Sequence, residues 1–176
     1  MYFFPQEKGD QLLDILSDVR CDEVVTSIKA TASHWDSRRG IGAELKKLAS
    51  QGCDVSVIVP DNIMQTKCDV RINMYPEVKV YTAHKLPHSK YLIVQGNYKG
   101  GDRQVVWAGS HNYSMPSLRL TDETLLELND EKVVASFVEN WDILRSKGTK
   151  DLFSDSSESA KNSCYEEYHQ KSGSLN

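Results

Sequence analysis

Apolar residues recur at spacings of three and four in three stretches of the chain. Such spacing places side chains on one face of a helix. The apolar faces consist of Leu12, Leu13, Leu16 and Val19, then of Ile41, Leu45, Leu48 and Ala49, and finally of Val133, Val134, Phe137, Trp141 and Leu144. The first helix is expected to end near Arg20, Gly52 is placed to end the second, and Asp130 is placed to cap the third. The pattern therefore predicts three amphipathic helices.

Short runs rich in β-branched and aromatic residues lie between and after these helices and predict strands. The predicted strands are residues 2–4, 23–30, 55–59, 78–82, 88–95, 104–107 and 124–128. Residues 62–75 have the least distinct pattern and are interpreted as a short helix and a loop. The order begins strand, helix, strand, helix, strand and continues with a strand-rich half and a closing helix. This order predicts an α/β fold with helices on both faces of a mixed sheet.

The composition changes near the end of the chain. Residues 148–176 are rich in Gly, Ser, Asp, Glu and Lys and contain few apolar residues, so they are expected to form a flexible polar tail. The chain has 176 residues and no internal repeat, and residues 1–147 are therefore expected to form a single domain.

Charge and hydropathy narrow the function classes. No apolar run approaches the roughly 20 residues that cross a bilayer, and residues 1–5 lack the pattern of a secretory leader, so a soluble chain is expected. The net charge of −4 gives no overall basic surface for nucleic acid. A local basic rim remains possible from Arg38, Arg39, Lys85, Lys90, Lys99 and Arg103.

The most informative residues are His88-Ser89-Lys90 and the later Gly109-Ser110-His111-Asn112. Alternation along the predicted strand places His88 and Lys90 on the same face. Residues 97–103 supply turn residues, and the returning strand brings residues 109–112 back toward His88. A hairpin is therefore expected to bring an imidazole, an ammonium, a hydroxyl and an amide together.

These groups fit the chemistry of a phosphodiester. Its cleavage needs a nucleophile or general acid near neutral pH, cations around the phosphoryl oxygens and neutral donors that hold the group in place. His88 is the candidate for the first role, Lys90 for the second, and Ser110 with Asn112 for the third.

At these residues the chain resembles the phospholipase D superfamily, whose signature is His-x-Lys, an Asp shortly after, and then Gly-Ser-x-Asn. Gln95 stands where the family usually has that Asp. Within the superfamily, the pattern is most similar to the second half of secreted bacterial members with two copies of the signature. The supporting segments are Phe3-Phe4-Pro5, Val19-Arg20-Cys21, Gln51-Gly52-Cys53-Asp54 and the stretch from Val106 to Ser114.

The resemblance implies an α/β/α sandwich and a covalent phosphohistidine, usually formed without metal, so neither a cofactor nor a metal site is expected. His88 would be the nucleophile or the general acid, Lys90 and Asn112 would bind phosphate, and Ser110 would support that pocket. Glu123 matches the acidic residue that leads into a strand and would orient His88. The resemblance also favours a secreted or extracytoplasmic location.

One histidine cannot be nucleophile and general acid in the same step, and this chain has no counterpart of the second. A symmetric homodimer, or a second motif-bearing half, would supply it. His34, His84 and His111 are interpreted as ordinary surface or core residues. The repeat of the spelling at His169-Gln170-Lys171 is interpreted as chance, because it lies in the polar tail.

Cys21 and Cys53 each precede a predicted strand, and neighbouring parallel strands would bring them within bridging range. A disulfide is predicted, and the alternative is two buried free thiols in a reducing compartment. Cys68 and Cys164 have no evident partner, and the spacing of the four cysteines does not resemble a zinc site.

Three function classes remain open. The favoured one is an enzyme, a phosphodiesterase of phospholipase D type. The second is a phosphate-binding module that does not turn over, and the third is a structural half-domain that packs against a catalytic half. Phospholipid, DNA and RNA all contain the diester, so the sequence leaves the substrate open.

Overall fold

The computed structural model describes residues 1–22, 24–60, 68, 70, 73–74, 76–83, 88–147 and 150–151. Within these ranges the strands form one sheet in the order β1-β7-β6-β5-β2-β3-β4-β8. The strands are β1 (Tyr2–Phe4), β2 (Ser27–Thr31), β3 (Asp54–Pro60), β4 (Lys79–Ala83), β5 (Tyr91–Tyr98), β6 (Gly101–Gly109), β7 (Glu123–Leu128) and β8 (Lys150–Asp151). β2, β3 and β4 run parallel, whereas the other pairs are antiparallel. The sheet is mixed, as predicted.

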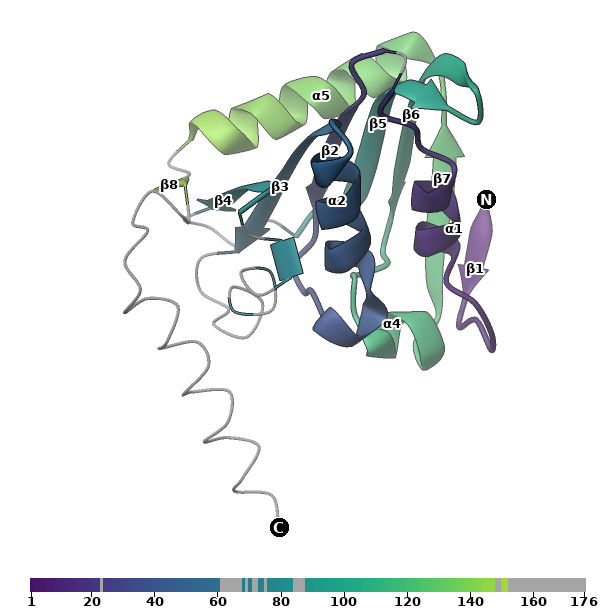
Figure 1. Ribbon diagram of the computed structural model, residues 1–176. Helices are drawn as coiled ribbons and strands as arrows, with labels where there is room; N and C mark the ends of the chain where they lie inside the picture. The colour runs from purple at the N-terminus through teal and green to yellow at the C-terminus, as the bar shows by residue number, and fades with distance from the viewer. Residues whose placement is uncertain are drawn as a thin grey trace.

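Helices cover both faces of this sheet. They are α1 (Gln11–Ser17), the short η1 (Ser37–Arg39), α2 (Ile41–Ser50), α4 (Met115–Arg119) and α5 (Glu131–Ser146). Figure 1 shows α1 and α2 side by side on one face and α5 along the other. The arrangement is the α/β/α sandwich that the resemblance implied. In the described ranges, no helix combines the length and the apolar character needed to cross a membrane.

The central strand β5 separates two hydrophobic cores. Leu92 and Val94 belong to the core beneath α1 and α2, whereas Tyr91 and Ile93 belong to the core beneath α5. The division follows from strand geometry, because successive side chains of a strand point to opposite faces. It explains why β5 is apolar on both sides.

The hairpin between β5 and β6 has a shorter turn than expected. Residues 97–103 were predicted to form the turn, but the strands continue to Tyr98 and resume at Gly101. Only Lys99 and Gly100 connect them, with φ of 53° and 70°. Two residues with positive φ form the turn type whose twist matches the flanking strands. The β5–β6 ladder is therefore long and fixes how the two strands are aligned.

Element boundaries differ from the predictions in several places. The expected strand at residues 23–30 is β2, which begins at Ser27, and His88 and Lys90 precede β5 instead of lying within it. The structure adds η1, α4 and β8. β8 pairs with β4 and includes Lys150 and Asp151, which were expected in the tail. The rest of residues 148–176, and most of residues 62–75, lie outside the described residues.

The predicted disulfide joins Cys21 to Cys53, with their Cα atoms 4.9 Å apart. The parallel pairing of β2 with β3 aligns Ser27 with Asp54 and brings the two preceding segments together. Cys68 is disulfide-bonded as well, so the expectation that it lacks a partner was wrong. That bond could not be predicted, because the residues around Cys68 form no distinct pattern in the sequence.

Candidate functional site

The two halves of the motif meet at the end of the sheet where β5 begins and β6 ends. The backbone N–H of Gly109 donates to the carbonyl of Lys90 at 3.2 Å. The N–H of Ser110 donates to the carbonyl of Thr124, also at 3.2 Å. β5, β6 and β7 therefore place residues 88–90, 109–110 and 123–124 along one edge.

Gly109 allows β6 and β7 to approach closely at this edge. A Cβ atom on Gly109 would lie 1.9 Å from the carbonyl oxygen of Thr124, far inside van der Waals contact. Only glycine fits there without moving one strand, so the first residue of Gly-Ser-x-Asn has a steric reason.

Lys90 is held beside His88. Its side chain is buried, and Nζ donates to Ser33 Oγ at 3.2 Å and to the carbonyl of His88. The same Nζ lies 3.2 Å from His88 Nδ1. His88 itself is exposed, so the imidazole is open to solvent while the ammonium lies beneath it.

Burial lowers the pKa of Lys90, because the charged form loses hydration, and the negative charge of Glu123 opposes part of that fall. Glu123 is half-buried at the start of β7 and accepts a hydrogen bond from Thr121 Oγ1 at 3.1 Å. Glu123 and Lys90 are therefore electrostatically coupled across the ends of β5, β6 and β7.

Ser110 and Asn112 complete the second half of the motif. The Oγ of Ser110 accepts from the N–H of Thr124 at 3.2 Å, so the exposed hydroxyl keeps its proton to donate. The carbonyl of Asn112 accepts from Arg39 Nη1 at 2.9 Å. Asn112 Oδ1 is buried, and among the described residues it has no hydrogen-bond partner.

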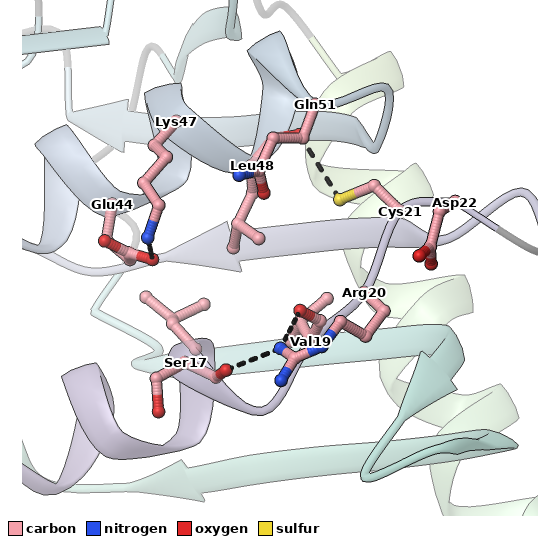
Figure 2. Close-up of a pocket in the computed structure, with 10 residues that line it drawn as sticks. Ser17, Val19, Arg20, Cys21, Asp22, Glu44, Lys47, Leu48 and Gln51 are labelled. Atoms are coloured by element: carbon pink, nitrogen blue, oxygen red, sulfur yellow. Dashed lines mark hydrogen bonds and ion pairs between the residues drawn. The ribbon is translucent and has the colours of Figure 1, made fainter.

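A cavity of about 450 Å³ opens next to Lys90 and Gly109, between the β5–β6 edge and α5. Its lining consists of Ser89, Lys90, Tyr91, Ala108, Gly109, Ser136, Phe137 and Asn140. A second cavity of about 440 Å³ lies between the C-terminal ends of α1 and α2, beside Cys21 (Figure 2). Only the first adjoins the motif.

A family profile described as "Cardiolipin synthase, PLD-like domain" matches residues 22–144, well over half of the chain. This chain belongs to the phospholipase D-like family. A comparison with curated protein sequences gave no match.

Several solved structures have a similar fold. Nuc from Salmonella typhimurium, a phospholipase D family member, has a TM-score of 0.63 and 19% identity, covering 85% of this chain and 95% of its own. NucT from Helicobacter pylori has a TM-score of 0.60 and 20% identity, covering 78% and 86%. Polyphosphate kinase from Porphyromonas gingivalis has a TM-score of 0.60 and 16% identity, covering 78% of this chain and 24% of its own. At these identities the likeness concerns the fold.

Gln95, at the position where the phospholipase D family usually has Asp, lies apart from this site. It is five residues beyond Lys90 on an extended strand, which corresponds to about 16 Å. Its Nε2 donates to Gln104 Oε1 at 3.1 Å. By alternation with Tyr91 and Ile93 it faces the α5 side. An acidic residue here would reach His88 only indirectly.

Three of the residues considered for a local basic rim do not contribute to one, and an exposed fourth, Arg38, pairs with Asp36. Arg39 is buried in an ion pair with Asp10. Lys99 and Arg103 lie at the far end of the β5–β6 hairpin, where Lys99 Nζ is 3.9 Å from Asp18 Oδ2. Lys85 lies outside the described residues. The cationic contribution to this site in the described part of the chain therefore comes mainly from Lys90.

The other histidines have separate surroundings. His111 is fully buried and stacks on Phe4 with ring centroids 3.8 Å apart, which agrees with its interpretation as a core residue. Burial first and the Arg39 charge second lower the pKa of His111 to about 3. His34 is exposed, and its carbonyl accepts from the N–H of Tyr113. His84 lies outside the described residues.

Two contacts next to the motif were not predicted from the sequence, which indicated Arg39 only as a possible rim residue and Ser33 not at all. Ser33 follows β2 and accepts a hydrogen bond from Lys90, and Arg39 holds the carbonyl of Asn112. The antiparallel pairing of Thr31 with Tyr91 brings the segment after β2 beside the start of β5. Since this pairing joins distant segments, local sequence patterns gave no signal for it.

Proposed function

We propose that this chain is a phosphodiesterase of phospholipase D type that cleaves a phospholipid or nucleic-acid diester through a phosphohistidine at His88. The observation that supports it best is the pair formed by His88 and Lys90. A buried ammonium 3.2 Å from an exposed imidazole places positive charge where a phosphoryl group would meet that ring. Ser110 and Asn112 lie on the adjoining strand end as neutral donors.

The chemistry takes two displacements at phosphorus. In the first, a nitrogen of one His88 attacks phosphorus, the bond to the leaving oxygen breaks, and a second imidazolium donates a proton to that oxygen. In the second, that imidazole removes a proton from water, which attacks phosphorus and breaks the P–N bond. The products are an alcohol and a phosphomonoester, and both histidines return to their starting forms.

The contact between Lys90 and His88 determines which tautomer the His88 ring adopts before substrate binds. A protonated lysine only donates, so Nδ1 of His88 accepts and the neutral ring carries its proton on Nε2. For Nε2 to attack, Lys90 turns toward the phosphoryl oxygens and Nδ1 becomes the protonated nitrogen. Glu123, which acts electrostatically on Lys90, is the candidate that stabilises this ring.

The second imidazole comes, in this proposal, from a symmetric homodimer or from a second motif-bearing half. A two-fold axis beside His88 would place two such rings on opposite sides of one phosphorus atom. The alternative function is a phosphate-binding module without turnover, which is favoured by Gln95 and by the single motif in the chain.

An extracytoplasmic location belongs to the same proposal. The disulfide between Cys21 and Cys53, together with the bonded Cys68, fits an oxidising compartment, where such bonds persist.

A diesterase assay on the purified chain tests the proposal. With phospholipid, DNA, RNA and bis(p-nitrophenyl) phosphate as substrates, His88→Ala should abolish turnover. Lys90→Ala should lower kcat by about 10²-fold, the usual effect of removing a preorganised contact to the phosphoryl oxygens. Chelators should have no effect, because Lys90 and Asn112 provide the charge and orientation.

Turnover that survives His88→Ala, or that EDTA removes and Mg²⁺ restores, would contradict the phosphohistidine mechanism. Binding of a phosphate analogue with no turnover of any diester would favour the binding module instead.

A further inference from the structure

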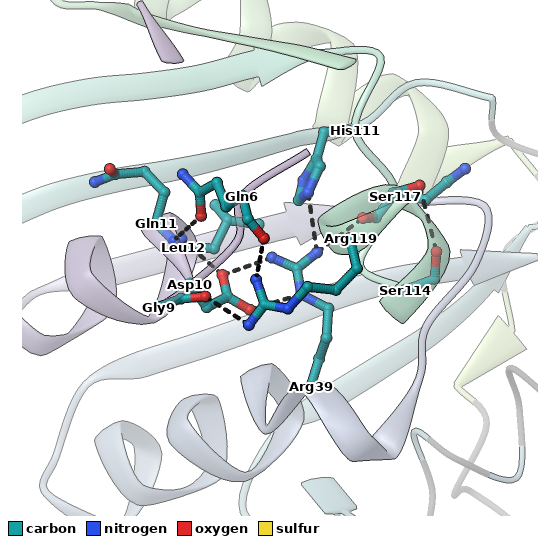
Figure 3. Close-up of polar contacts among 11 residues, drawn as sticks. Gln6, Gly9, Asp10, Gln11, Leu12, Arg39, His111, Ser114, Ser117 and Arg119 are labelled. Carbon is teal, nitrogen blue, oxygen red and sulfur yellow. Dashed lines mark hydrogen bonds and ion pairs between the residues drawn. The ribbon is translucent and has the colours of Figure 1, made fainter. Parts of the chain in front are cut away.

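Beneath the Gly-Ser-x-Asn loop lies a buried guanidinium that the proposed chemistry does not use (Figure 3). Arg39 is only 3% exposed. Its Nε and Nη2 donate to the two carboxylate oxygens of Asp10 at 2.7 and 2.6 Å. This two-point contact fixes the plane of the guanidinium.

Both members of this ion pair are held by their own segments. Asp10 caps α1 by accepting from the N–H of Leu12 at 3.0 Å. Arg39 is the last residue of η1, whose first turn is capped by Asp36. The ion pair therefore joins α1 to the segment before α2 and leaves the guanidinium little freedom.

The remaining nitrogen of Arg39 points at the site loop. Nη1 donates to the carbonyl of Asn112 at 2.9 Å and lies 3.3 Å from His111 Nε2. Because arginine only donates, His111 Nε2 accepts and the neutral ring carries its proton on Nδ1. His111 is in turn stacked on Phe4 of β1. One guanidinium thus contacts two consecutive residues of the loop.

The energetics of the Arg39–Asp10 ion pair favour a role in positioning Asn112 over a role in stabilising the fold. Removing both charges of a buried ion pair from water offsets much of their attraction, and well-packed apolar replacements are often equally stable. What an apolar pair could not supply is a donor at the carbonyl of Asn112. The N–H of Tyr113 belongs to the same peptide unit as that carbonyl and donates to the carbonyl of His34, so both polar groups of the peptide that follows Asn112 are held.

We propose that Arg39, anchored by Asp10, is a positioning residue that sets the place of the Asn112 side chain against the phosphoryl group. The inference rests on the proposed function, because it assigns Arg39 an effect on phosphoryl binding through Asn112. Arg39 itself does not touch the substrate.

A double-mutant cycle tests this role. Arg39→Lys keeps the charge but loses the fork that contacts Asp10 and Asn112 together. It should lower kcat by about 10- to 100-fold, the scale on which a misplaced group costs rate. In the Asn112→Ala background the same substitution should change kcat less than about 2-fold, because the group that it positions is gone. Arg20→Lys is the matched control: Arg20 is exposed beside Cys21 and also donates to main-chain carbonyls, those of Ser17 and Val19, so kcat should be unchanged.

An equal fold-loss from Arg39→Lys in both backgrounds would overturn the proposal, since that result indicates a general structural effect. So would a kcat within about 2-fold of wild type in the single variant. Urea unfolding of each variant accompanies the kinetics. If Arg39→Lys does not fold, Asp10→Asn replaces it, because asparagine keeps a cap oxygen for Leu12 and loses the ion pair.

The same double-mutant cycle is repeated with tungstate affinity, measured by calorimetry, as the readout. This measurement does not depend on turnover. Loss of tungstate affinity on Arg39→Lys that disappears in the Asn112→Ala background supports the positioning role even if the wild type cleaves no diester. A loss that persists in that background contradicts it. Failure of the diesterase proposal is seen separately, in the wild-type assay.

Discussion

At the scale of single residues, the site depends on a lysine whose charge is held partly out of water. Burial lowers the pKa of Lys90, and Glu123 raises it by a smaller amount. The ammonium is needed at the phosphoryl oxygens, so activity should be lost as pH rises through the Lys90 pKa. That loss should occur below the usual range for lysine.

The variant Glu123→Gln tests this coupling. Removing the carboxylate removes the effect that raises the Lys90 pKa, so the alkaline limb of the kcat/KM profile should move to still lower pH. That limb reports the free enzyme, which is the state described here. Glu127→Gln is the control, because Glu127 lies farther along β7 and contacts Tyr2 and Trp107. An alkaline limb that stays in place or moves upward in Glu123→Gln would contradict the account.

Candidate residues could be recognised from the sequence where they belong to a short motif. His88, Lys90, Ser110 and Asn112 fall in two short segments, and one hairpin is enough to bring those segments together. Arg39 could not be found in this way, because its partners Asp10 and Asn112 are 29 and 73 positions away. Such contacts depend on how β1, β2 and β6 are ordered in the sheet, which no local pattern specifies.

Among the helices and strands, those with a regular apolar period were predicted from the sequence, whereas the shortest ones were not. α2 and α5 were predicted well, because each has an apolar face at helical spacing and a clear end or cap. α4 has five residues and β8 has two, too few to display a period. The hairpin turn was predicted too long, since its polar residues on both sides of Lys99 and Gly100 pair in the ladder instead.

Gly109→Ala tests the close approach of β6 and β7 at the site. The added methyl group would meet the Thr124 carbonyl, so the strands must separate and Ser110 must move with them. The free energy of unfolding should fall by about 1–3 kcal/mol, the usual cost of forced overpacking, and diesterase activity should fall more than stability explains. Urea unfolding and kcat/KM measure the two effects.

Gly101→Ala is the matched control on the same strand, because its nearest neighbour would be Arg103 Nε at an ordinary 3.6 Å. Equal effects of the two substitutions on stability and activity would show that the contact at Gly109 has no special importance.

At the scale of the whole molecule, the single motif makes oligomeric state part of the mechanism. If one site uses His88 from each of two chains, a dimer with one His88→Ala subunit lacks either the nucleophile or the acid. When wild-type and His88→Ala chains are co-expressed in equal amounts, activity per total protein should fall to about one quarter of wild type, because both subunits must be intact. Sedimentation should show a dimer. A fully active monomer, or activity that falls only to about half, would show independent sites.

The proposed mechanism requires a covalent bond between phosphorus and His88, and that bond can be trapped. The chain is mixed with bis(p-nitrophenyl) phosphate, quenched in alkali to preserve phosphohistidine, and digested for peptide mass spectrometry. We expect a phosphoryl adduct on the peptide that contains His88 and no adduct in the His88→Ala variant. Turnover of the diester with no adduct at His88, or with the adduct on another residue, would contradict it.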